Sequence, residues 1–110
     1  MVEVGLFSSL RRKNRPGTMR GASERDTKHL EEWAATRRGV EAYVEPRTTV
    51  TETTVVLIAH DGEWTRRRIG SPDAAQSFGR KRGIPVYDVA KVGYPNRMRE
   101  YTRRMKKAQG

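Results

Sequence analysis

The stretch TETTVVLIAHDGEWTRRRI, residues 51–69, decides the fold of this 110-residue chain. Its first part is dense in β-branched residues and contains an unbroken apolar run at 55–58. An Asp-Gly pair, Asp61-Gly62, separates this run from a second extended segment, and such a pair is the strongest short-range signal for a β-hairpin. We therefore expect two antiparallel strands joined by a two-residue turn, with Leu57 opposite Arg66.

The second strand of this hairpin would place Trp64, Arg66 and Arg68 on one face. One face must be buried, and a bulge of a single residue in the turn would exchange the facing pairs. The sequence therefore leaves open whether the odd or the even positions of residues 55–58 fill the core.

Segments on either side of the hairpin complete an α+β pattern. Before it, Ser23 and Asp26 form a capping box that begins a helix ending near Gly39, and a short strand follows until Pro46. After it come a helix capped by Ser71-Pro72-Asp73, a strand at 84–89 and a last helix opened by Tyr94-Pro95.

The expected element order is thus αβββαβα, in a single α+β domain over residues 23–110. A small antiparallel sheet should carry the helices, largely on one face. Residues 1–22 mix five basic side chains with Ser, Pro and Gly and predict a flexible, disordered basic arm. Besides the hairpin, we expect the core to contain Leu30, Trp33, Phe78 and Val86.

Charge is unevenly distributed along the chain. The formal net charge is +10, and residues 64–110 hold 13 Lys or Arg against 3 Asp or Glu. Residues 24–63 hold 5 basic and 9 acidic side chains, so this half is acidic. A strongly basic half predicts a polyanionic partner.

We therefore expect a non-catalytic module that binds RNA or DNA, associated with a ribosome or nucleoid, mainly through phosphate contacts. Trp64 on one face with Arg66 and Arg68 resembles a stacking platform with phosphate clamps beside it, although a solvated face with Arg stems covering the ring would look the same. The basic triplet at 80–82 also suits the dipole of a helix end, whereas the last helix carries too few acids for an ordinary solvated helix. The expected contact residues are Trp64, Arg66, Arg68, Arg80, Lys81, Arg82, Arg97, Arg103 and Arg104.

Two other functional classes stay open. In a protein-interaction adaptor, the acidic first helix and the basic last helix would serve separate partners or pair with each other between protomers. In a small enzyme, His60, Asp61 and Glu63 at the hairpin tip, with His29, would carry the chemistry.

Several kinds of site are disfavoured. The chain has no cysteine for thiolate metal sites or redox pairs, and it has no G-x-G-x-x-G or P-loop spacing, so neither a metal nor a cofactor is expected. No apolar run approaches the ~18 residues of a membrane span. We expect a cytoplasmic protein without a membrane partner.

Two resemblances add expectations. The order αβββα over 23–83 is similar to that of double-stranded RNA-binding domains, but the second helix lacks the family's basic start and the Gly-Pro-x-His loop is missing. The segments RPGTMRG (15–21), VEPRTTVTETTVVLIAHDGEWTRRRI (44–69) and IPVYDVAKVGYPNRMREY (84–101) resemble an uncharacterised family of short basic proteins from high-GC bacteria. Some members of that family carry a generic oxidoreductase label, which implies an activity that the motifs of this sequence do not support.

Overall fold

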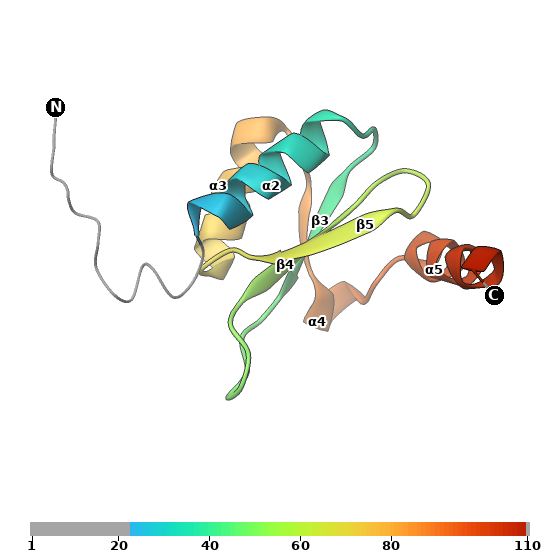
Figure 1. Cartoon of the computed structure of the whole chain (residues 1–110). Coiled ribbons are helices and arrows are strands. Elements are labelled where there is room, and N and C mark those ends of the chain that lie inside the picture. The colour runs from blue at the N-terminus through green and yellow to red at the C-terminus, as the bar shows by residue number, and fades with distance from the viewer. Residues whose placement is uncertain (1–22, 110) are drawn as a thin grey trace, which may run out of the picture.

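The computed structural model describes residues 23–109, and the predicted N-terminal arm lies outside them (Figure 1). The α+β class and the expected element order are confirmed, with one additional short helix before the last one. The elements are α2 (Glu24–Ala35), β3 (Glu41–Glu45), β4 (Thr54–Ile58), β5 (Trp64–Arg68), α3 (Pro72–Arg82), β6 (Val86–Asp88), α4 (Val89–Val92) and α5 (Asn96–Gln109). Within these residues, every helix is too short or too polar to cross a membrane.

The four strands form one sheet in the order β5-β4-β3-β6. Strand β4 pairs antiparallel with both β3 and β5, as expected. Strand β6 instead runs parallel to β3, with Ala42 opposite Val86, so the sheet is mixed and not purely antiparallel. Helix α3 lies between β5 and β6 in the chain and forms part of the crossover connection that this parallel pairing requires.

The hairpin forms between β4 and β5, but its predicted register was wrong by one residue. The amide of Ala59 donates to the carbonyl of Glu63 at 2.8 Å, which leaves a loop of three residues in place of two. Gly62 ends this loop with φ +94, the left-handed conformation that a three-residue hairpin loop takes at its bulge. Leu57 therefore lies opposite Thr65, and Val56 lies opposite Arg66.

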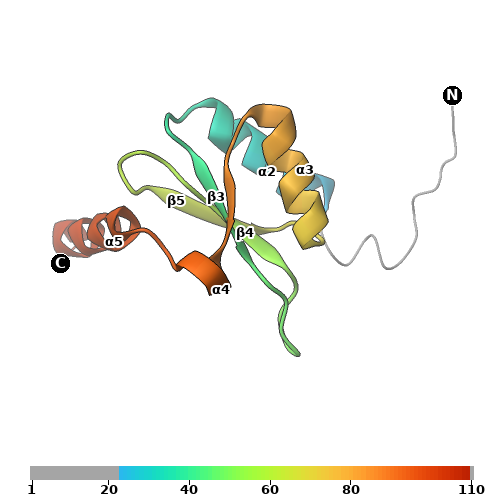
Figure 2. The same ribbon diagram turned by 180° about the vertical axis from the view of Figure 1, so that it is seen from behind.

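Both faces of the sheet are covered, and this resolves the choice that the sequence left open. Helices α2 and α3 lie together on one face, where they pack on the odd positions of β4, while α4 lies on the other side (Figure 2). Tyr43, Val56 and Ile58 form a second cluster on the opposite face, with Trp64, Val89, Tyr94 and Met98 packed against it. All four residues of the apolar run at 55–58 are fully buried as a result.

The caps predicted for the first two helices are present. Ser23 and Asp26 form the reciprocal capping box of α2, and the Ser71 side chain accepts from the amide of Ala74 at the start of α3. Helix α2 ends at Thr36, earlier than expected, and α3 ends at Gly83 in the left-handed conformation. The predicted core residues Leu30, Trp33 and Phe78 are buried, and Val86 is partly buried against them.

Candidate nucleic-acid interface

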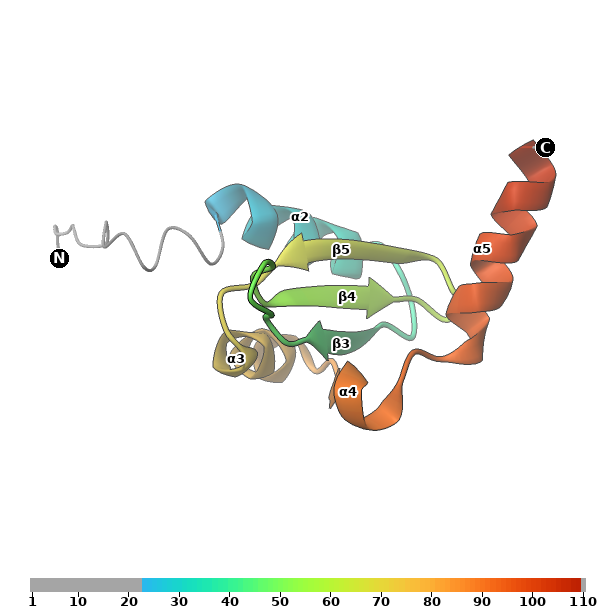
Figure 3. The ribbon, with the colours of Figure 1, turned by 90° about the horizontal axis from the view of Figure 1, so that it is seen from below.

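The first two turns of α5 are fixed to the hairpin and to β3. The Arg97 guanidinium donates to the carbonyl of Ala59 at 2.9 Å and to the carboxylate of Glu41 at 2.7 Å. The indole nitrogen of Trp64 donates to the hydroxyl of Thr102 at 3.1 Å. These contacts place α5 at the end of the sheet where the hairpin turns (Figure 3).

Gly62 allows this close approach. A Cβ atom at this position would lie 2.0 Å from the carbonyl oxygen of Arg97 and 2.9 Å from the Cβ of Tyr101. The three-residue loop of the hairpin is therefore also the surface on which the start of α5 packs.

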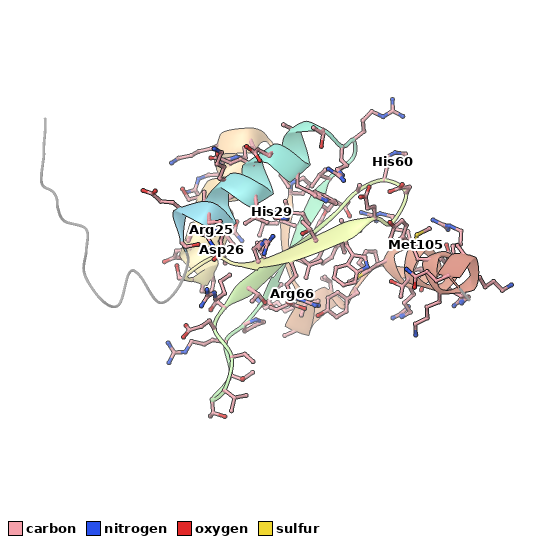
Figure 4. The ribbon with its side chains drawn as sticks, in the orientation of Figure 1. Arg25, Asp26, His29, His60, Arg66 and Met105 are labelled. Carbon is pink, nitrogen blue, oxygen red and sulfur yellow. The ribbon has the colours of Figure 1, made fainter. Side chains whose placement is uncertain are left out.

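The remainder of α5 extends beyond the sheet, where all residues from 103 to 109 are exposed (Figures 1 and 3). Met105 lies on this projecting part and is 39% exposed (Figure 4). On the same helix, exposed basic residues follow one another at intervals of three and four positions, which places them on one side. We call this set the basic stripe of α5; its members are Arg99, Arg103, Lys106 and Lys107.

Four arginines of the basic half outside this stripe are paired with carboxylates of the protein itself. Among the described residues, four of the five salt bridges join an arginine of the basic half to a carboxylate of the acidic half. These four bridges are Arg66–Glu45, Arg68–Asp26, Arg82–Glu31 and Arg97–Glu41. Four of the nine acidic residues at 24–63 thus act as counter-charges of the basic half. The basic stripe takes part in none of these bridges.

Trp64, the predicted stacking platform, is partly buried on the face of the sheet that α5 joins. Its indole N–H is engaged by Thr102, and the Arg66 guanidinium lies 5.3 Å from the centre of its rings. These contacts favour the alternative in which Arg stems cover the ring. The bond to Thr102 joins the start of β5 to α5, whereas Arg68 at the other end of the strand lies beside α2.

Arg66 and Arg68 of the same strand are both held by carboxylates. Arg66 donates to the two carboxylate oxygens of Glu45 at 2.8 and 3.0 Å. Arg68 lies 3.8 Å from Asp26, the capping-box partner of Ser23, and the Arg68 side chain is 54% exposed. Of the two, Arg68 is the more open to a ligand.

The basic triplet at 80–82 lies at the C-terminal end of α3, on the opposite face of the sheet from α5. Arg82 pairs with Glu31 and donates to the carbonyl of Phe78 at 3.1 Å. Arg80 and Lys81 are exposed and form no salt bridge with any described residue. The structure therefore does not bring this triplet together with α5.

Of the three contact residues predicted on α5, two are bonded to other parts of the protein and one is exposed. Arg97 joins the first turn of α5 to Glu41 of β3, and Arg104 donates to the carbonyl of Asp61 at 3.0 Å. Arg103 is exposed and belongs to the basic stripe. The sequence favoured a phosphate-contacting role for the whole basic helix, but the list of expected contact residues omitted Arg99, Lys106 and Lys107, whose helical spacing groups them with Arg103.

A network of carboxylates supports the surface beneath α5. Burial acts to raise the pKa of Glu45, but hydrogen bonds from Arg66, Thr54 and Tyr94 outweigh it and hold that pKa below its ordinary value. Glu41 behaves in the same way: burial opposes the bonds from Arg97 and Tyr43, yet its pKa is also lowered. Both carboxylates are therefore charged at neutral pH.

Two of the three residues considered for an enzyme at the hairpin tip, Asp61 and Glu63, already have structural partners, whereas His60 is exposed. An oxygen of Asp61 accepts from the amide of Glu63 at 3.0 Å, and Glu63 pairs with Arg37 at 2.8 Å. His29 lies between α2 and β5, 2.7 Å from the hydroxyl of Thr65 and away from His60 (Figure 4). Across residues 23–109, no group of three His, Asp or Glu side chains could hold a metal ion.

Comparisons of the chain with protein-family models, curated proteins and solved structures found no match. The functional conclusion therefore depends on the geometry of the chain itself.

Proposed function

We propose that the protein is a non-catalytic module that binds RNA or DNA, with the basic stripe of α5 as its principal contact surface. The observation that supports this most strongly is that Arg99, Arg103, Lys106 and Lys107 are exposed on one side of a helix without an ion-pair partner among residues 23–109. An ordinary solvated helix mixes charges of both signs, whereas Glu100 is the one acidic residue of α5.

The salt bridges reduce the number of arginines that a phosphate could contact without competition. A phosphate would have to compete with a carboxylate for Arg66, Arg82 or Arg97, but not for a residue of the basic stripe. Arg80 and Lys81 form a smaller basic patch on the other side of the fold. We therefore place the main phosphate contacts on α5.

The setting is proposed on sequence grounds. The lack of cysteine and the resemblance to short basic proteins of high-GC bacteria suit a cytoplasmic protein associated with a ribosome or nucleoid. Phosphate contacts alone carry no sequence information, so we propose binding without base specificity.

Fluorescence anisotropy with labelled RNA and DNA oligonucleotides tests the proposal. About four phosphate contacts should lower the affinity roughly 50–150-fold between 50 and 200 mM salt. The variant Arg103→Glu/Lys106→Glu should lose at least about 10-fold in affinity and flatten the salt dependence by about two contacts.

Arg80→Glu/Lys81→Glu is a matched control, because it makes the same change of charge at two exposed residues on the opposite face. It should retain the affinity within about 3-fold if α5 is the contact surface. Equal losses in the two variants would show that overall charge, and not α5, drives binding. Absence of binding at 50 mM salt, or binding that salt does not weaken, would contradict the proposal. Capture of a protein partner that survives nuclease treatment would favour the adaptor alternative instead.

A further inference from the structure

A hollow lies beside α5, between the helix and the segment that leads into it. It has a volume of about 440 Å³, within the range of about 300–1,000 Å³ that is common for ligand pockets. Its lining combines apolar and cationic side chains. Tyr94 and Met98 belong to the apolar cluster beneath it, and the other lining residues are Arg99, Thr102, Arg103 and Lys106.

The aromatic ring of this lining, that of Tyr94, is fixed by a hydrogen bond from its hydroxyl group. The Tyr94 hydroxyl donates to the carboxylate of Glu45, which also accepts from Thr54 at 2.6 Å and from Arg66. A ring fixed in this way loses little conformational freedom when a planar ligand contacts it. Aromatic side chains of this kind are the surfaces on which unpaired bases stack.

The wall of the hollow also offers one hydrogen-bond donor. The Thr102 oxygen accepts from the indole nitrogen of Trp64 at 3.1 Å, and its own proton has no acceptor within residues 23–109. A hydroxyl in this state can donate to a base edge or to a sugar oxygen.

Three members of the basic stripe line the same hollow. Successive positions at 99, 103 and 106 rise along the helix by about 6 Å and then about 4.5 Å. Arg103 and Lys106 are exposed and form no salt bridge in the described part of the chain, and Arg99 donates to the side chain of Asn96 at 2.6 Å.

We propose that this hollow receives an unpaired base of a single-stranded nucleic acid, while Arg99, Arg103 and Lys106 contact the neighbouring phosphates. This inference rests on the proposed function and adds the class of ligand to it. A base within a duplex is stacked and paired, so it cannot enter the hollow without being extruded. The protein should therefore prefer single strands to duplexes.

The first measurement compares the full-length protein with oligonucleotides of equal length as single strands and as duplexes, in both RNA and DNA. At 50 mM salt, we expect at least one single strand to bind about 10-fold more tightly than its duplex. Preference for RNA over DNA would indicate a contact with the 2′-hydroxyl, and equal affinity would indicate that base and phosphate suffice.

The second measurement isolates the ring of Tyr94. Tyr94→Phe and Tyr94→Leu both remove the bond to Glu45, but only Tyr94→Leu removes the flat surface. We expect Tyr94→Leu to weaken single-strand binding about 5- to 150-fold relative to Tyr94→Phe, with duplex binding equal in the two variants. Far-ultraviolet circular dichroism of both variants controls for folding.

The outcomes separate the two proposals. Salt-dependent binding with equal affinity for single strands and duplexes would overturn the hollow as a base site and leave the proposed function standing. Equal single-strand affinity of folded Tyr94→Leu and Tyr94→Phe would overturn it as well. Absence of binding to every probe would contradict the proposed function itself.

Discussion

Arg97 of α5 donates to Glu41 of β3 across 56 positions of sequence, with the two side chains 2.7 Å apart. The same guanidinium also donates to the carbonyl of Ala59 at the end of β4. A single side chain thus joins the last helix to two strands of the sheet.

Arg97→Met should lower the free energy of unfolding by about 2 kcal/mol, because it leaves the Glu41 carboxylate and the Ala59 carbonyl without their donor. Urea denaturation followed by circular dichroism measures this. Arg103→Met makes the same change at an exposed position and should lower the free energy of unfolding by less than about 0.5 kcal/mol. Similar effects of the two substitutions would contradict the role given to Arg97.

Gly62→Ala should be more damaging than Gly83→Ala, although both glycines have positive φ values, +94 and +68. The new methyl group would collide with the Arg97 carbonyl in the first case and meet nothing within 4 Å in the second. Backbone strain alone costs about 1 kcal/mol, and the added clash should bring the loss for Gly62→Ala to at least about 2 kcal/mol. Equal losses would mean that α5 does not rest on the loop.

Stability should fall in acid because the pKa values of Glu41 and Glu45 are lowered on folding. A lowered pKa in the folded state stabilises the protein above the ordinary value of 4.5, and this contribution disappears as the pH falls below it. Urea denaturation between pH 7 and pH 3 should show the decline. The double variant Glu41→Gln/Glu45→Gln should be less stable at pH 7 and less sensitive to acid; an unchanged slope would refute this origin.

An alkaline transition should come from Tyr43. Burial, and then the bond to Glu41, raise the pKa of this phenol from 10.0 to about 12. Its contribution to stability is complete below pH 10 and is lost as the pH rises through 12. A titration of phenolate absorbance should therefore contain a late step that Tyr43→Phe removes, and persistence of that step in Tyr43→Phe would assign it to another tyrosine.

Local signals in the sequence predicted the elements but not how they meet. Ser23, Ser71 and the Asp61-Gly62 pair act within a few residues, so their effects are readable from the chain alone. The same Asp-Gly pair serves two-residue and three-residue loops, so the pair alone does not fix the loop length. The hairpin register was therefore predicted wrongly.

The sequence did contain a signal that both faces of the sheet are covered. An unbroken apolar run such as 55–58 is typical of a strand that is buried on both sides, whereas a half-exposed strand alternates. The pairing of β5 arginines with Glu45 and Asp26 had no such signal, because it joins side chains far apart in the sequence. As a result, the sequence showed where the basic residues lie along the chain, but not which of them pair with a carboxylate in the folded protein.

The arrangement of charge on α5 also affects the helix that carries it. Like charges four positions apart, such as Arg99 and Arg103 or Arg103 and Lys107, repel each other by about 0.2–0.5 kcal/mol per pair. The last turns have no sheet beneath them, and a short isolated helix is only marginally stable in water. A polyanion laid along the stripe would remove the repulsion, so binding and helix formation should reinforce each other and the C-terminal turns should gain order when the ligand arrives.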